Sequence, residues 1–189
     1  MTKHISNIEI SVSEMAYGNQ MIHLIFDHTK IDFSGSYIGV CPLSSLIDIV
    51  AEIDSDIEYE NFPDEISETW LDEPGMLELT IRYDGNIDNI EITISDEDFF
   101  SQSKIIKPLN KYNFIVKHDD LRVAVVKEAS RMLRTYGLRG YNSNWANGID
   151  NFPVSAFLRL MGNKSNLYKE SDTYSSNLEY EISLLKSIL

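Results

Sequence analysis

Residues 77–94 read LELTIRYDGNIDNIEITI, and they carry the clearest secondary-structure signal in the chain. Apolar side chains occupy every second position on both sides of the Asp-Gly pair at residues 84 and 85. The first run is Leu77, Leu79, Ile81 and Tyr83, and the second is Ile90, Ile92 and Ile94. A spacing of two places these side chains on one face of a strand, and Asp-Gly is among the strongest turn signals. The stretch therefore predicts an antiparallel hairpin.

Residues 7–34 show the same alternation in two further blocks. The apolar positions are Ile8, Ile10 and Val12 in the first block and Ile22, Leu24 and Phe26 in the second. Tyr17-Gly18-Asn19 between them has the composition of a turn, so a second hairpin is expected. Ile31 and Phe33 either extend its second strand or begin another one.

Two long helices are predicted from apolar residues at helical spacing. Pro42 suits the first turn of a helix, where no backbone donor is needed, and the pattern that follows predicts an end near Ile53. Asp119 or Asp120 is the expected N-cap of the second helix. Gly137 is its expected end, because glycine commonly terminates helices.

Two shorter helices follow, and together these elements define the fold class. Pro153 begins a short helix that runs through Met161, and Ser176 with Glu179 forms a capping box for a C-terminal helix. Strands thus dominate the first half of the chain and helices the second. This order predicts an α+β fold, in which an antiparallel sheet built from hairpins carries helices on one face.

Charge is divided unevenly along the chain. Residues 1–102 contain 22 acidic and 3 basic side chains, whereas residues 103–189 contain 8 acidic and 13 basic ones. No Lys or Arg occurs in residues 31–81, which include 13 acidic residues. A chain of this length is expected to form one domain over residues 1–189, with a strand-rich acidic part and a helix-rich basic part. The electric field of the acidic part favours a positively charged partner.

Composition also disfavours several classes of protein. A net charge of −14 would repel nucleic-acid phosphates and anionic membrane surfaces, so we expect neither as a partner. No apolar run is long enough to cross a membrane, and the N-terminus lacks the apolar core of a signal peptide. A cytoplasmic location is therefore expected. The single Cys41 allows no internal disulfide, and no Cys/His cluster suggests a bound metal or other cofactor.

No familiar set of catalytic residues is visible. Serine-hydrolase elbows, phosphate loops, dinucleotide fingerprints and zinc-protease motifs are all missing from the sequence. His23, Asp27 and His28 are close in sequence, but on a strand His28 faces the opposite side, so a metal site is not expected. Cys41 lies beside a predicted helix start, which favours a lowered pKa, although a buried thiol is the simpler interpretation. Because no pair of nucleophile and base can be named, we expect no enzymatic activity.

The acidic residues 54–75, with a short strand expected at 66–71, have two interpretations. In one, they form a solvated surface. In the other, they bind a basic protein, with an aromatic side chain such as Trp70 as an anchor inside a charged rim. Core packing is the alternative role for Trp70. The predicted contact residues are Glu58, Glu60, Asp64, Glu65, Glu68, Trp70, Asp72 and Glu73.

Two segments together resemble small bacterial proteins that are associated with polymorphic-toxin or contact-dependent growth-inhibition loci. The segments are SYIG at residues 36–39 followed by PLSSLI at 42–47, and WLDEPG at 70–75 followed by a hairpin. This resemblance implies an immunity protein that neutralises a cognate toxin domain, with no catalytic residues to transfer. The alternative is a small-ligand or regulatory binding module, which would use an open sheet face or the Asn- and aromatic-rich loop expected at 141–148.

Overall fold

Two β-sheets and four helices make up the part of the chain that the computed structural model describes. The described residues are 2–16, 19–35, 40–59, 65–72, 75–83, 89–98, 110–144, 151–162 and 178–188. The strands pair mainly antiparallel, and the helices pack against the sheets, so the predicted α+β class is confirmed.

The first sheet contains three strands in the order β2-β3-β4. These are β2 (Ile8–Ala16), β3 (Asn19–Phe26) and β4 (Thr29–Gly35), all antiparallel. The expected hairpin is therefore confirmed, and the residues after it begin a separate strand. A β-bulge interrupts the register of β2 between Val12 and Glu14. Bulges of this kind redirect the side chains around them.

The second sheet has the order β1-β8-β7-β6-β5. Its strands are β1 (Lys3–His4), β5 (Ile66–Asp72), β6 (Gly75–Tyr83), β7 (Asn89–Asp98) and β8 (Asn110–Lys117). Only the short pairing of β1 with β8 is parallel. The β6–β7 pairing confirms the hairpin predicted from residues 77–94, whose turn lies outside the described residues.

Helix α1 (Pro42–Tyr59) begins where the sequence predicted but ends six residues later than Ile53. No Gly or Pro occurs between these two ends to stop it. The consequence is that the first part of the acidic stretch is helical rather than a loop.

Helix α2 (His118–Asn144) breaks at Gly137, where φ is 65° and ψ is 169°. The glycine therefore ends the first helical segment as expected, but a second segment resumes after it and includes residues 141–144. Those four residues were predicted to be a loop, and that prediction was wrong; residues 145–148 lie outside the described residues. Helix α3 (Val154–Met161) matches its prediction, and α5 (Leu178–Ser187) is the last helix.

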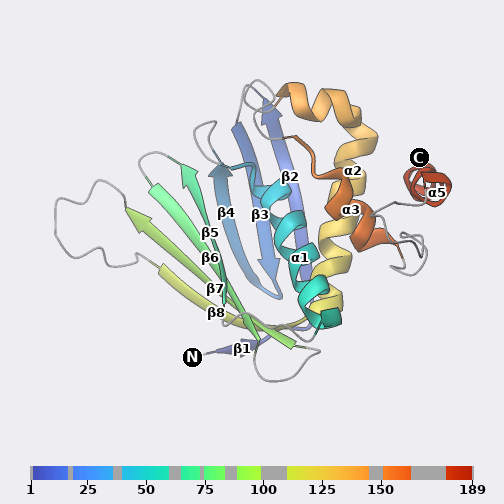
Figure 1. Cartoon of the computed structure of the whole chain (residues 1–189). Coiled ribbons are helices and arrows are strands. Elements are labelled where there is room, and N and C mark those ends of the chain that lie inside the picture. The colour runs from blue at the N-terminus through green and yellow to red at the C-terminus, as the bar shows by residue number, and fades with distance from the viewer. Residues whose placement is uncertain are drawn as a thin grey trace.

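One core joins the sheets and the helices (Figure 1). The inner faces of the two sheets contact each other through Phe26 and Phe114, whose ring centroids are 4.4 Å apart, and through Phe33 and Trp70 at 5.7 Å. Strand β4 lies beside β5, helix α1 contacts β3 and β5, and α2 lies along β2. The alternate residues of each strand face away from this core.

Candidate functional site

The predicted contact residues are distributed over more than one element. Glu58 belongs to the last turn of α1, and Asp72 is the last residue of β5. Glu60, Asp64 and Glu73 lie outside the described residues. The helical placement of Glu58 links the predicted site to the acidic part of α1.

Glu65 and Glu68 do not share a surface. Glu68 pairs across the sheet with Leu79, a buried core residue, so its side chain is on the inner side of β5. Glu65 instead forms an ion pair of 2.5 Å with Arg82, which alternates with the core residues of β6 and so faces outward. This arrangement does not support a single acidic patch around β5.

Trp70 is a core residue and not a surface anchor. Its exposed fraction is 0%, its indole Nε1 donates a hydrogen bond of 3.1 Å to Ser45 Oγ, and its ring packs against Phe33. A buried indole needs such a partner for its N–H group. The predicted role of Trp70 in partner binding was therefore wrong, and the core alternative holds.

Helix α1 concentrates negative charge, and one of its carboxylates, that of Asp54, lies 3.0 Å from His118 Nε2 on α2. Asp48 and Glu52 are exposed one turn apart, and Asp54, Asp56 and Glu58 follow in its last two turns. The helix contains no Lys or Arg. Like charges four residues apart each cost roughly 0.2–0.5 kcal/mol, and carboxylates near a helix C-terminus oppose the helix dipole. The isolated helix is thus electrostatically unfavourable.

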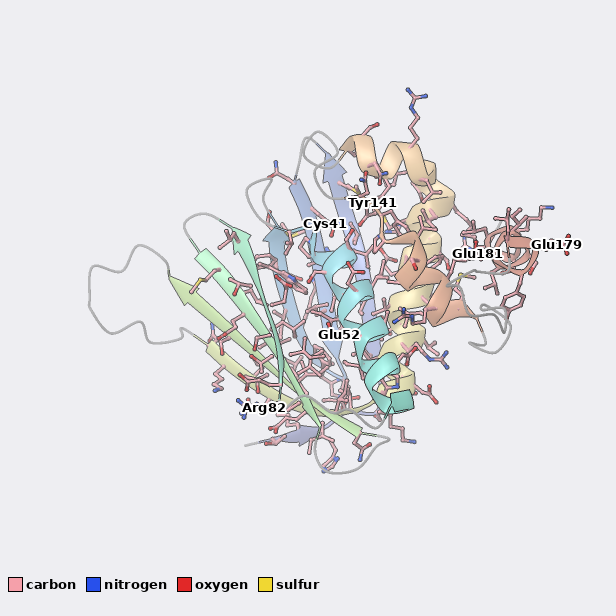
Figure 2. All side chains as sticks on the ribbon, viewed as in Figure 1. Cys41, Glu52, Arg82, Tyr141, Glu179 and Glu181 are labelled. Carbon is pink, nitrogen blue, oxygen red and sulfur yellow. The ribbon has the colours of Figure 1, made fainter. Side chains whose placement is uncertain are left out.

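A shallow cleft of about 380 Å³ separates α1 from α3. Its lining residues are Asp48, Ala51, Glu52, Ser155, Ala156 and Arg159. The Arg159 guanidinium is 3.5 Å from the Ala51 carbonyl oxygen, to which it donates. Figure 2 shows Glu52 on α1, far from Glu179 and Glu181 on α5. The molecule therefore carries exposed carboxylates on two separate helical surfaces.

A buried polar cluster fixes the start of α1. Tyr141 OH lies 3.0 Å from Cys41 Sγ and 3.1 Å from Ser44 Oγ, and Gln20 Oε1 accepts the Leu43 N–H at 3.0 Å. Figure 2 shows Cys41 and Tyr141 close together. Burial raises the pKa of the Cys41 thiol despite the nearby helix start, so the expected buried thiol is confirmed and the alternative of a lowered pKa does not hold. Burial likewise raises the pKa of Tyr141.

His23, Asp27 and His28 do not converge on a common point. The Asp27 carboxylate accepts hydrogen bonds from the backbone N–H groups of Ser6 and Asn7, at 3.1 and 2.9 Å. The His23 ring, on β3, is engaged elsewhere. Within the described ranges, no group of three or more His, Cys, Asp or Glu side chains is arranged to hold a metal ion.

The His23 ring belongs to a hydrogen-bonded chain that sequence reasoning missed. Its Nε2 lies 2.8 Å from Ser13 Oγ on β2, and its Nδ1 lies 2.6 Å from Asp32 Oδ1 on β4. The absence of a nameable nucleophile–base pair was the reason to expect no enzyme, and the fold places such a pair together. The pairing register of three strands creates this Ser13–His23 pair, and no local sequence motif indicates that register.

Across its described helices, the chain offers no segment with both the length and the apolar character needed to cross a membrane. Comparisons with protein-family models, with curated proteins and with solved structures found no match to the chain. The immunity-protein resemblance accordingly remains a prediction from the two quoted segments.

Proposed function

We propose that the chain is a cytoplasmic immunity-type protein that neutralises a basic toxin or nuclease domain by binding it through helix α1, a function that needs no catalysis by the chain. The observation that carries the proposal is the charge pattern of α1, which has five acidic residues and no basic one. A partner that presents Lys and Arg would offset the repulsion within this helix. Departures from favourable local patterns are expected at functional sites.

The contact surface in this proposal differs from the set chosen from sequence. Glu58 stays a prediction, because only its place in the last turn of α1 is described, and Asp48 and Glu52 are added because both are exposed on that helix. Trp70 leaves it because the indole is buried. The surface is therefore defined as the α1 acidic surface: Asp48 and Glu52.

The cleft beside α1 is suited to a basic side chain of the partner. Ala51 and Ala156 contribute small apolar side chains to its lining, and the two carboxylates of Asp48 and Glu52 outnumber the single guanidinium of Arg159. The aliphatic stem of a Lys or Arg packs against apolar surface while its charged end stays near water or an anion. A Lys or Arg of the partner could thus make the apolar contact and the ionic contact in the same cleft.

Co-expression tests the proposal directly. The proposed toxin is sought among the genes next to this chain's gene, and a bacterial strain then carries an inducible copy of it together with the full-length chain. We expect the cells to survive and the two proteins to copurify as a stable complex. Cell death at matched expression, with no complex, would reject the immunity function.

A matched pair of variants then locates the contact. Asp48→Lys with Glu52→Lys reverses two charges on α1, and Glu179→Lys with Glu181→Lys reverses two on α5. Each pair raises the formal net charge from −14 to −10, so only the location differs. Cells that express the α1 variant should die, and cells that express the α5 variant should survive. Equal protection by both would remove α1 from the contact.

A small-ligand binding module is the second candidate, and the cleft is the observation that favours it. Its volume of about 380 Å³ falls in the range of small-molecule pockets, roughly 300–1,000 Å³. Arg159 and the two carboxylates would orient a ligand that carries both charges. Native mass spectrometry of the purified protein should then show a bound small molecule that is lost in an Arg159→Ala variant.

A further inference from the structure

The outer face of the three-stranded sheet carries a Ser–His–Asp chain. Ser13 Oγ lies 2.8 Å from His23 Nε2, and His23 Nδ1 lies 2.6 Å from Asp32 Oδ1. His23 alternates with the core residues Ile22 and Leu24, so its ring faces away from the core. These are the contacts that join nucleophile, base and orienting carboxylate in serine hydrolases, which are recognised by geometry and not by sequence position.

The strand register assembles this chain. His23 pairs directly with Asp32 across β3 and β4, and Ser13 lies in the bulge of β2, between Val12 and Glu14. Ser11 is the residue opposite His23, and Ser13 is two positions after it. In a regular strand, Ser13 would be a diagonal neighbour of His23 and would lie farther from the ring. The bulge therefore brings the hydroxyl within hydrogen-bond distance of the ring.

Helix α2 holds the bulge in place through both backbone groups of Val12. Glu128 Oε1 accepts the Val12 N–H at 2.6 Å, and Arg131 donates to the Val12 carbonyl oxygen at 2.6 Å. Arg131 also donates two hydrogen bonds to the Glu128 carboxylate. The position of Ser13 is thus fixed by an ion pair on another element, in which Glu128 is buried and Arg131 is partly exposed. Support of this kind is what a precise site requires.

The protonation states follow from the partners. Hydrogen bonds from Lys30 and then from His23 lower the pKa of Asp32, so that carboxylate is ionised and can only accept. His23 Nδ1 must therefore donate to Asp32. In the neutral ring this leaves Nε2 as the acceptor for the Ser13 hydroxyl, which is the arrangement a general base needs.

We propose that Ser13 is a nucleophile activated by His23, and that it accepts the acyl group of an activated carboxylic ester. The bond from Ser13 Oγ to the acyl carbon forms while the ester bond to the leaving oxygen breaks. The Ser13 proton passes to His23 Nε2 and then to that leaving oxygen. Water next attacks the acyl carbon and gives a proton to His23, which returns it to Ser13 Oγ as the carboxylic acid leaves.

This activity is separate from toxin binding. Ser13 is exposed, and the side chains of His23 and Asp32 are 18% and 49% exposed, on the face of the sheet opposite to the core that α1 packs against. A general base contributes about 10²–10⁴-fold to such a reaction. On an open face, where water competes for every donor, we expect the lower end of that range and a preference for reactive esters.

The test uses the full-length chain and p-nitrophenyl acetate. Release of p-nitrophenolate gives the rate, and peptide mass spectrometry gives the acetylated residue. We expect one acetyl group on Ser13 and a rate at least about tenfold lower in His23→Gln. Ser11→Ala is the matched control, because Ser11 pairs directly with His23 but no hydrogen bond to the ring is recorded for it. It should react as the wild type does.

Two results would overturn the proposal. One is acetylation of Ser13 no faster than that of Ser11 in the wild-type protein. The other is a less than tenfold slower reaction in a His23→Gln variant that keeps the wild-type circular dichroism spectrum. Asp32→Asn provides a second variant for the positioning role of Asp32: it should slow acetylation and shift its pH profile, and an unchanged profile counts against that role.

Discussion

Replacing Arg131 by Met should destabilise the protein strongly, although Arg131 itself is largely at the surface. Its guanidinium bonds to both oxygens of the Glu128 carboxylate, at 2.8 and 2.6 Å. Glu128 is only 3% exposed, whereas the Arg131 side chain is 45% exposed. The substitution keeps the packing of the hydrocarbon stem but leaves a buried carboxylate without its counter-ion.

The expected magnitude follows from this asymmetry. Removing one partner and leaving the other charge buried costs about 3–5 kcal/mol. Glu128→Met leaves Arg131 free to be solvated and removes mainly the acceptor of the Val12 N–H, which costs about 1–3 kcal/mol. The Arg131 variant should therefore be the less stable of the two by about 2 kcal/mol.

Urea unfolding of the two variants, followed by circular dichroism, measures this difference. The midpoints should fall while the slope with urea stays constant, because the buried surface is nearly unchanged. The double variant should be more stable than Arg131→Met alone, since no buried charge is left. The reasoning is refuted if Arg131→Met costs under about 1 kcal/mol, or if Glu128→Met is the more destabilising change.

Three further outcomes are expected. Tyr141→Phe removes the hydroxyl that lies between Cys41 and Ser44 and should lower the free energy of unfolding by about 1–2 kcal/mol in urea. Gly137→Ala should cost about 1–3 kcal/mol by thermal or urea unfolding, because φ is 65° there while no atom lies within 4 Å of the added methyl; an unchanged midpoint would contradict this. Burial raises the pKa of Cys41 above its ordinary value of 9.0, so the folded state holds this proton more tightly than the unfolded one. The contribution of Cys41 to the free energy of unfolding is thus complete below about pH 9 and is lost as the pH rises through the raised pKa. In Cys41→Ala, the free energy of unfolding should therefore fall less over this pH range than it does in the wild type.

The hairpins and most helix starts were predictable because local residues determine them. Alternation in residues 77–94 with an Asp-Gly turn specifies a hairpin whatever surrounds it, and Pro42 and Pro153 mark helix starts by their own geometry. The region after Gly137 was not predictable. Its Asn-rich composition suggests a loop, but burial of Tyr141 against the start of α1 stabilises a helical segment there.

The candidate sites depend on contacts between distant residues, which explains why sequence reasoning placed them poorly. Glu65 and Glu68 are only three residues apart, yet strand alternation places their side chains on opposite sides of β5, and Glu65 pairs with Arg82. Ser13 and Asp32 meet His23 only because of a bulge and a three-strand register. Neither the bulge nor the register leaves a local signal in the sequence.

The association rate constant between the full-length chain and its proposed basic toxin partner is the measurement that decides whether α1 binds that partner. Stopped-flow mixing over a range of salt concentrations should show fast association that slows as salt rises, because screening weakens the attraction of α1 for the basic partner. Asp48→Lys with Glu52→Lys should lower the rate constant about tenfold at low salt, and Glu179→Lys with Glu181→Lys should leave it nearly unchanged. A rate constant that is independent of salt, or equally affected by the two pairs, would contradict the role of α1.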